Sequence, residues 1–402
     1  MKMKRTLPLA DLRISKKAKE YVNLVLDSNR LTYGPMTKKF EVEFAKIHKR
    51  KFAIFTNSGS SALLVSLLAL KEHYKWQDYD EVIVPALTFI SSANVILQAN
   101  LTPVFVDVEK DYYCIDPQKI EEKITKKTKA IMPVHLFGQS SDMNALLKIS
   151  KKHKLRILED SCETMFVSYE KKPIGSLGDI SVYSTYTAHI LVTGVGGIIT
   201  TNNLKLAEII KSLIFHGRNN VYLNIDDDNT SNPAKLKTMI NKRFEFNRIG
   251  YSLRLTEMEA ALGLAELERK NHTIIMKKRA GNLLNSVFEK FPQSFIIPKV
   301  RPKAEHIYML YPVIIKNPKI KRNDLLLHLE KNGIETRLFF PLLSQPIYKK
   351  LFKSKKEKYP ASEYLVKNGF IIGANPYFSD SDAEYLRNIL ESYFKKEELK
   401  VI

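Results

Sequence analysis

Short β-rich runs alternate with stretches of helical periodicity between residues 50 and 205, and this alternation constrains the fold more than any other feature. Seven runs have strand character: 52–56, 81–86, 103–108, 130–137, 156–160, 179–185 and 197–201. Stretches between the first five carry apolar residues three or four positions apart, as amphipathic helices do: 60–74, 90–99, 117–124 and 143–153. We therefore predict an α/β fold with a seven-stranded, mostly parallel sheet, whose ligand binds beyond the carboxyl ends of the strands.

The length of 402 residues exceeds the usual size of a domain with a single hydrophobic core, so we expect a large domain with a smaller one beside it. We place the large, ligand-binding domain at residues 1–250. The small C-terminal α/β domain, with the helix that connects the two, is placed at residues 251–402. Further predicted elements are a helix at 204–216, an exposed loop rich in Asp and Asn at 221–235, a helix at 256–270 capped by Thr256 with Glu259 three residues on, and a helix at 321–333 ended by Gly333.

Composition narrows the class of function. The longest apolar run, 62–70, is about half of a bilayer span and the first residues lack the apolar core of a signal peptide, so we expect a cytoplasmic protein without a membrane segment. The two cysteines, Cys114 and Cys162, show no metal-ligand spacing and are too few for an iron–sulphur cluster, so we expect no metal site. The net charge of +21 is mostly Lys, spread without a nucleic-acid-binding motif, which favours a solvated surface over a nucleic-acid partner. Such a field would still attract a diphosphate-bearing substrate.

Three polar features lie at predicted strand ends. Gly59 and Ser60 follow the first strand and precede a helix, so their N–H and hydroxyl groups could hold a phosphate, although Ser and Gly are also ordinary capping residues. Asp160 ends the fifth strand, where a buried carboxylate either meets a cation, such as a pyridinium nitrogen, or caps the next turn. The polar, Gly-rich turn between the last two strands is typical of a binding site, and its His189 is either a site residue or a structural hydrogen-bond donor.

A series of motifs in fixed order resembles the sugar aminotransferase family called DegT/DnrJ/StrS. The motifs cover nearly the whole chain: GP at 34–35, NSGSSAL at 57–63, DEVIVPALTF at 80–89, PVFVDV at 103–108, VHLFG at 134–138, ILEDSCE at 157–163, GSLGD at 175–179, GVGG at 194–197, FHGR at 215–218, GYSLRLTEMEAALG at 250–263, GIETR at 333–337 and QPIY at 345–348. The resemblance implies the fold of aspartate aminotransferase, which is fold type I of the pyridoxal-phosphate enzymes. It also implies a homodimer with the active site at the subunit interface.

The resemblance implies a cofactor, pyridoxal 5′-phosphate or pyridoxamine 5′-phosphate, and assigns residues to it. Gly59, Ser60 and Ser184 would contact the phosphate. The ring of Phe89 would stack on the cofactor, and Asp160 would pair with the pyridinium nitrogen.

Three further positions depart from the family or vary within it. Glu163 falls where the family has a Gln or another polar residue near the ring hydroxyl. Ser252 replaces the Asn with which the second subunit usually touches the phosphate. Leu343 replaces a His, so we expect a different substrate pocket.

The main departure is His189, five residues after Ser184, where the family has the lysine that binds the cofactor covalently. Imidazole cannot form that bond, so non-covalent binding is expected. The same replacement occurs in relatives that remove the C3 hydroxyl of a nucleotide-linked 4-keto-6-deoxy sugar, and two cysteines allow only the type without an iron–sulphur cluster. Those relatives tend to carry a second histidine where this chain has Ile190. The resemblance thus implies C3 dehydration with His189 as acid and base.

Two other functions stay open at this stage. One is a glutamate-dependent aminotransferase of the same family, with another group in the role of the lysine. The other is a non-catalytic cofactor-binding or regulatory protein. In the enzymatic readings the substrate is a nucleotide-diphosphate sugar and the expected amino donor is glutamate.

Overall fold

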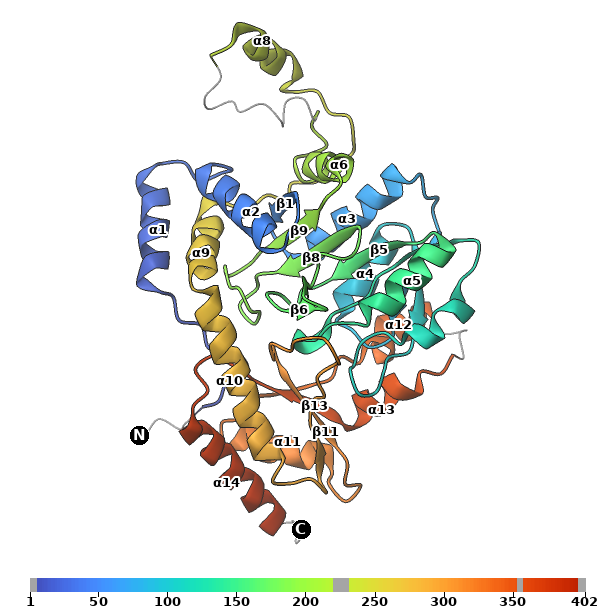
Figure 1. Cartoon of the computed structure of the whole chain (residues 1–402), viewed down its shortest axis with the longest axis vertical. Helices are drawn as coiled ribbons and strands as arrows, with labels where there is room; N and C mark the ends of the chain where they lie inside the picture. The colour runs from blue at the N-terminus through green and yellow to red at the C-terminus, as the bar shows by residue number, and fades with distance from the viewer. Residues whose placement is uncertain (1–5, 220–230, 353–356, 397–402) are drawn as a thin grey trace.

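The computed structural model describes residues 6–219, 231–352 and 357–396. At its centre lies a seven-stranded sheet in the order β1-β9-β8-β5-β4-β2-β3 (Figure 1). The strands are β1 (Phe52–Thr56), β2 (Glu81–Pro85), β3 (Thr102–Val106), β4 (Thr128–Ile131), β5 (Arg156–Asp160), β8 (Ile180–Ser184) and β9 (Gly197–Thr201). β9 is antiparallel to its neighbours β1 and β8, and the other adjacent pairs are parallel. The predicted fold class and its seven-stranded, mostly parallel sheet are confirmed.

Helices cover both faces of the sheet because successive strand residues point to opposite sides. On one side, Phe55 and Ile83 pack with α2 (Pro35–Ile47), α5 (Met143–His153) and α9 (Glu257–Glu268). On the other side, Ile54 and Val84 pack with helices α3 (Gly59–His73), α4 (Ile90–Gln98) and α6 (Leu204–Ile214). The sheet is therefore buried on both faces, and its strand ends are left to carry a site.

A third apolar cluster lies in the C-terminal part of the chain. It packs around a four-stranded antiparallel sheet in the order β10-β11-β13-β12. Its elements are β10 (Phe295–Ile296), β11 (Tyr311–Ile315), β12 (Thr336–Leu338), β13 (Gly369–Ile372), α10 (Lys270–Phe288), α11 (Arg322–Lys331) and α14 (Asp380–Lys396). Leu7 belongs to this cluster and its amide donates to the Gly333 carbonyl at 2.7 Å, so the N-terminal segment packs here.

The remaining elements belong to none of these three groups. They are α1 (Lys16–Asp27), α8 (Pro233–Lys242), α12 (Pro346–Leu351), α13 (Pro360–Asn368), β6 (Ser168–Tyr169), β7 (Lys172–Pro173) and the short 3₁₀ helices η1 (Pro117–Lys119), η2 (Glu121–Lys123), η3 (Leu136–Gly138) and η4 (Leu342–Ser344). α8 projects away from the sheet (Figure 1). Among the described residues, no helix combines the length and the apolar character that a membrane span needs.

Most helix predictions are confirmed, including the start of α9. The Thr256 side chain accepts an amide of the first turn, and the Glu259 carboxylate accepts the Thr256 amide at 3.1 Å, which is a capping box. Gly333 follows α11 with a φ of 73°, as a glycine that ends a helix does.

Three local predictions were wrong in part. The stretch 117–124 forms the two 3₁₀ helices η1 and η2, because Asp116 caps a tight first turn by accepting the Gln118 amide at 3.0 Å and the backbone is extended again at Ile124. The strand predicted at 130–137 ends at Ile131, and Phe137 has a φ of 57°, which no strand adopts. Of the loop predicted at 221–235, residues 221–230 lie outside the described residues, and Pro233 instead begins α8 with Asn232 as its cap.

Candidate active site

A cavity of about 700 Å³ opens at the carboxyl ends of the parallel strands, where ligands of such sheets bind. Seven of the eight residues proposed from the sequence line it: Gly59, Ser60, Phe89, Asp160, Glu163, Ser184 and His189. They come from the first turns of α3 and α4, the end of β5 and the turn between β8 and β9. The fold thus brings together side chains more than a hundred positions apart.

The start of α3 offers hydrogen-bond donors to an anion. Ser58 caps the helix, with its Oγ accepting the Ser61 amide at 3.1 Å. The amides of Gly59 and Ser60 have no acceptor within the helix, and the positive end of the helix dipole lies there. A Cβ on Gly59 would sit 3.0 Å from the Cβ of Ser184 and from Sγ of Cys162, so a larger residue would push the helix start away from β8. This arrangement fits a phosphate group.

Phe89 presents an aromatic face to the cavity. It caps α4, and 54% of its surface is exposed, which is unusual for a ring of this size. Its described aromatic neighbour, Phe340, meets it edge to face with 5.8 Å between ring centroids. A flat ligand ring can therefore stack on Phe89.

Asp160 is a buried carboxylate that makes no ion pair within the described chain. Its Oδ2 accepts the Ser92 hydroxyl at 2.8 Å, and its Oδ1 accepts the Cys162 amide at 3.2 Å. Burial raises the pKa of Asp160 even though these hydrogen bonds lower it. Asp160 caps the following turn, as one interpretation of the sequence had it, whereas its pairing with a cation in the cavity stays a prediction.

Glu163 lines the same cavity as Asp160, and its pKa is raised in the same direction. Its Oε2 accepts the Phe137 amide at 2.9 Å. Burial raises the pKa of Glu163 to about 8, and the charge of Asp160 acts in the same direction. Glu163 is therefore protonated at neutral pH and can donate a hydrogen bond into the cavity.

His189 is half-buried in the turn after β8, where its amide donates to the Tyr186 carbonyl at 2.9 Å. Among the described residues its Nδ1 is buried without a hydrogen-bond partner, so Nε2 is the ring nitrogen that a ligand can reach. Burial lowers the pKa of His189 to about 4, and the charge of Lys277 contributes to the decrease. The imidazole is therefore neutral at pH 7. None of the cavity-lining residues in the described chain is a lysine.

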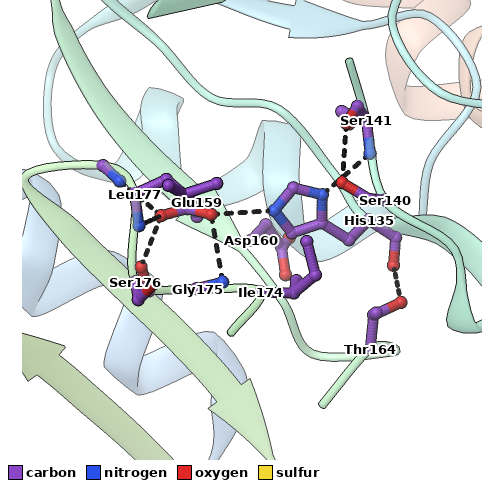
Figure 2. A network of polar contacts seen from close by, with 12 residues as sticks. His135, Ser140, Ser141, Glu159, Asp160, Thr164, Ile174, Gly175, Ser176 and Leu177 are labelled. Atoms are coloured by element: carbon purple, nitrogen blue, oxygen red, sulfur yellow. Dashed lines mark hydrogen bonds and ion pairs between the residues drawn. The ribbon is translucent and has the colours of Figure 1, made fainter. Parts of the chain in front are cut away.

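Glu159, which the sequence gave no reason to single out, anchors the strand that carries Asp160. Its buried carboxylate lies 3.1 Å from Nε2 of His135. It also accepts the amides of Gly175 and Leu177, as Figure 2 shows. Arg50 lies 3.7 Å from the same carboxylate. The Ser141 amide donates to Nδ1 of His135 at 3.0 Å, so the ring proton sits on Nε2 and points at Glu159.

The sequence also missed the C-terminal contribution to the cavity. Glu335 and Arg337, around the start of β12, form an ion pair at its wall, and Phe340 follows them. The Leu9 amide donates to Glu335 at 2.9 Å, which brings the N-terminal segment to the same wall. The GIETR motif was a signal for the first two residues, whereas a contact between the chain's two ends has no local signature.

Two residues named from the sequence lie elsewhere. Ser252 is exposed outside the cavity, with its Oγ 3.3 Å from the Arg254 guanidinium, so its contact through a second subunit stays a prediction. Leu343 lines a separate cavity of about 460 Å³. Among the described residues, no three His, Cys, Asp or Glu side chains are grouped as metal ligands.

Comparison with known proteins places this site in a family. The sequence profile of the DegT/DnrJ/EryC1/StrS aminotransferase family matches residues 12–391. GDP-perosamine synthase of Escherichia coli O157:H7 is 31% identical over 96% of this chain and 98% of its own. The structure of E. coli GDP-4-keto-6-deoxy-D-mannose-3-dehydratase with bound hydrated PLP matches with a TM-score of 0.86, at 27% identity over 96% of this chain and 99% of that one. The structure of a Helicobacter pylori aminotransferase involved in pseudoaminic acid biosynthesis also matches with a TM-score of 0.86, at 25% identity over 98% of this chain and 100% of that one. The chain is therefore an enzyme of the DegT/DnrJ/EryC1/StrS aminotransferase family.

Proposed function

We propose that the protein is a pyridoxal-phosphate-dependent dehydratase that removes the C3 hydroxyl of a nucleotide-linked 4-keto sugar, with His189 as its acid and base. The observation that carries the proposal is the imidazole of His189 in a cavity whose described lining contains no lysine. Without an amine to bond to, the cofactor is held non-covalently. The similarity to the E. coli 3-dehydratase supports this choice within the family.

The residues of the cavity fit pyridoxal phosphate or its amine form. The amides of Gly59 and Ser60, with Ser184, would hold the phosphate. Phe89 would stack on the ring, and Asp160 would keep the ring nitrogen protonated. When bound as pyridoxamine phosphate, the cofactor supplies an amine that condenses with the sugar ketone and a ring that acidifies the neighbouring C–H bond.

His189 would then move the proton. Its neutral imidazole takes the acidified proton at Nε2, and the resulting imidazolium donates it to the C3 hydroxyl as that group leaves. The lowered pKa of His189 makes the imidazolium a good proton donor. Because the described cavity lining holds no lysine that could capture the cofactor and complete an amine transfer, elimination is favoured.

The same proposal includes the partners predicted from the sequence. The cavity volume suits a sugar with part of its nucleotide diphosphate, and glutamate would convert the cofactor to its amine form. A homodimer is supported by the exposed apolar side chains next to Ser252, of which Ile249 is 96% exposed and Phe244 78%. The cytoplasmic location and the absence of an iron–sulphur cluster stay predictions.

A glutamate-dependent sugar aminotransferase is the second candidate. It is favoured by the 31% identity to GDP-perosamine synthase, which exceeds the identity to the dehydratase structure. A non-catalytic role is disfavoured because Phe89, Asp160 and Ser184 are all retained in one cavity.

Product analysis tests the proposal. The purified protein is incubated with pyridoxal phosphate, glutamate and a panel of nucleotide-linked 4-keto sugars, and the product masses are measured. A sugar that has lost one oxygen atom supports dehydration. A sugar whose ketone has become an amine, with glutamate consumed in equal amount, supports the aminotransferase and overturns the first proposal.

A further inference from the structure

Lys277, on the inner face of α10, is a buried cation without an anion. Only 4% of it is exposed, and no carboxylate of the described chain pairs with it. Its Nζ donates to the backbone carbonyl groups of Met309 at 2.9 Å and Tyr308 at 3.5 Å. The next residue, Lys278, forms an ordinary ion pair with Glu305 at 2.8 Å. A buried, unpaired ammonium group costs stability, so its presence calls for a role other than packing.

A small cavity of about 40 Å³ connects Lys277 to His189, which lines both this cavity and the active-site cavity. The small cavity is large enough for a water molecule, and the buried hydroxyl of Thr273 in its wall has no partner in the part of the chain that the structure describes. Its other charged groups pair with one another: Arg13 with Asp11 at 3.0 Å, and Arg269 with Glu266 at 3.7 Å.

The charge left uncompensated in the small cavity that His189 lines is therefore positive. Lys277 is the one charged group of the small cavity left without a counter-charge in the described chain. The active-site side carries the titratable groups Asp160, Cys162, Glu163, Tyr186, and the paired Glu335 and Arg337. In serine-protease triads the group behind the histidine is a carboxylate, which stabilises the imidazolium. Here the group on that side of the histidine is a cation, which destabilises the imidazolium.

We propose that Lys277 is a positioning residue for His189: when its buried amine is protonated, it keeps the imidazole neutral before the proton is taken and makes the imidazolium a stronger acid afterwards. The catalytic meaning of this inference rests on the proposed function, whereas the electrostatic coupling between the two side chains does not. Such tuning suits a step in which a hydroxyl must be protonated as it leaves.

The ionisation of both groups agrees with this coupling. Burial lowers the pKa of Lys277 to about 7, so the lysine is still charged over the acidic range in which His189 titrates. Burial is the main cause of the lowered pKa of His189, and the Lys277 charge is the next. Removing the charge should therefore raise the pKa of His189 only part of the way to its ordinary value.

The test is an NMR titration of the His189 ring in the cofactor-free protein, with the resonance assigned by its loss in His189→Asn. Lys277→Met removes the charge, Lys277→Gln removes it but keeps a donor for the Met309 carbonyl, and Lys278→Met is the matched control. We expect a pKa of about 4 in the parent and the control, and about 5 or higher in both Lys277 variants. An unchanged pKa in folded Lys277 variants overturns the proposal, as does a failure of both to fold, which would make the lysine purely structural.

The pH profile of turnover links the coupling to catalysis. At pH 5 an imidazole with a pKa of about 4 is about 90% neutral. The neutral fraction falls to roughly 50% for a pKa of about 5 and to roughly 3% for a pKa of about 6.5. Turnover at pH 5 relative to pH 7.5 should therefore fall about two- to thirtyfold in Lys277→Met and not in Lys278→Met. If the NMR shift is seen but His189→Asn stays fully active, the coupling stands and the proposed function fails. If the NMR shift is absent, the proposed coupling between Lys277 and His189 is wrong, whichever reaction the enzyme catalyses.

Discussion

Replacing Glu159 by Gln tests how the fold holds Asp160 at the cavity. Burial acts to raise the pKa of Glu159, but the hydrogen bond from His135, the Arg50 cation and the Gly178 amide lower it from an ordinary 4.5 to about 2. A lowered pKa means that folding favours the charged form. At about 1.4 kcal/mol per pKa unit, the ionised carboxylate contributes roughly 3 kcal/mol to stability at pH 7.

The glutamine variant should lose about that much or more. An amide offers one acceptor oxygen, and its NH₂ group would face amides that also donate, such as those of Gly175 and Leu177. Arg50 would remain buried without its anion, a situation that costs about 3–5 kcal/mol. Because β5 carries Asp160 as the next residue, cofactor affinity should fall as well.

Urea unfolding of the two proteins from pH 7 down to pH 3 measures this effect. Glu159 has the lower pKa when folded, so its contribution is complete above the unfolded pKa and is lost as pH falls from about 4.5 toward 2. The difference between parent and variant should therefore shrink with acid. Glu121→Gln is the matched control, since Glu121 also bonds a His and a Lys, at 2.7 Å each, but on the surface. Equal effects of the two substitutions, or a difference independent of pH, would refute the reasoning.

Two further predictions concern the cofactor. Asp160→Asn should leave the fold intact but remove turnover, because the ring nitrogen of the cofactor loses the anion that keeps it protonated. Unchanged turnover would mean that Asp160 only caps the turn through its hydrogen bond with the Cys162 amide. Borohydride treatment of the pyridoxal-phosphate complex followed by mass spectrometry should leave the chain unmodified, since no lysine lines the described cavity, and a pyridoxyl group on any active-site lysine would contradict non-covalent binding.

The sheet and the strand-end residues could be predicted because local patterns carry them. The strand at 156–160 places Asp160 at its last residue, and the Gly59 turn lies at a strand–helix junction, so topology alone brings the two to one edge. The capping box at Thr256 is equally local. These features depend on neighbours within a few positions, which a sequence displays directly.

The rest depended on contacts between distant segments. Glu159 looks like a second acidic residue in a strand end, and only the folded chain shows Arg50 and His135 around it. Lys277 belongs to a helix rich in cations, and nothing in its spacing distinguishes it from Lys278, although one is buried and the other paired at the surface. The lowered pKa of His189, which the sequence alone did not indicate, follows from the same long-range packing.

The most direct test of the central claim is the substitution His189→Asn, measured for both cofactor affinity and turnover of the keto-sugar substrate. The claim is that His189 transfers protons and does not hold the cofactor. Because Phe89, Asp160 and the start of α3 are untouched, affinity for pyridoxamine phosphate should stay the same. Turnover should fall by about a hundred- to ten-thousandfold, as on loss of a general acid or base. A variant that turns over as fast as the parent would make His189 a structural residue and contradict the mechanism.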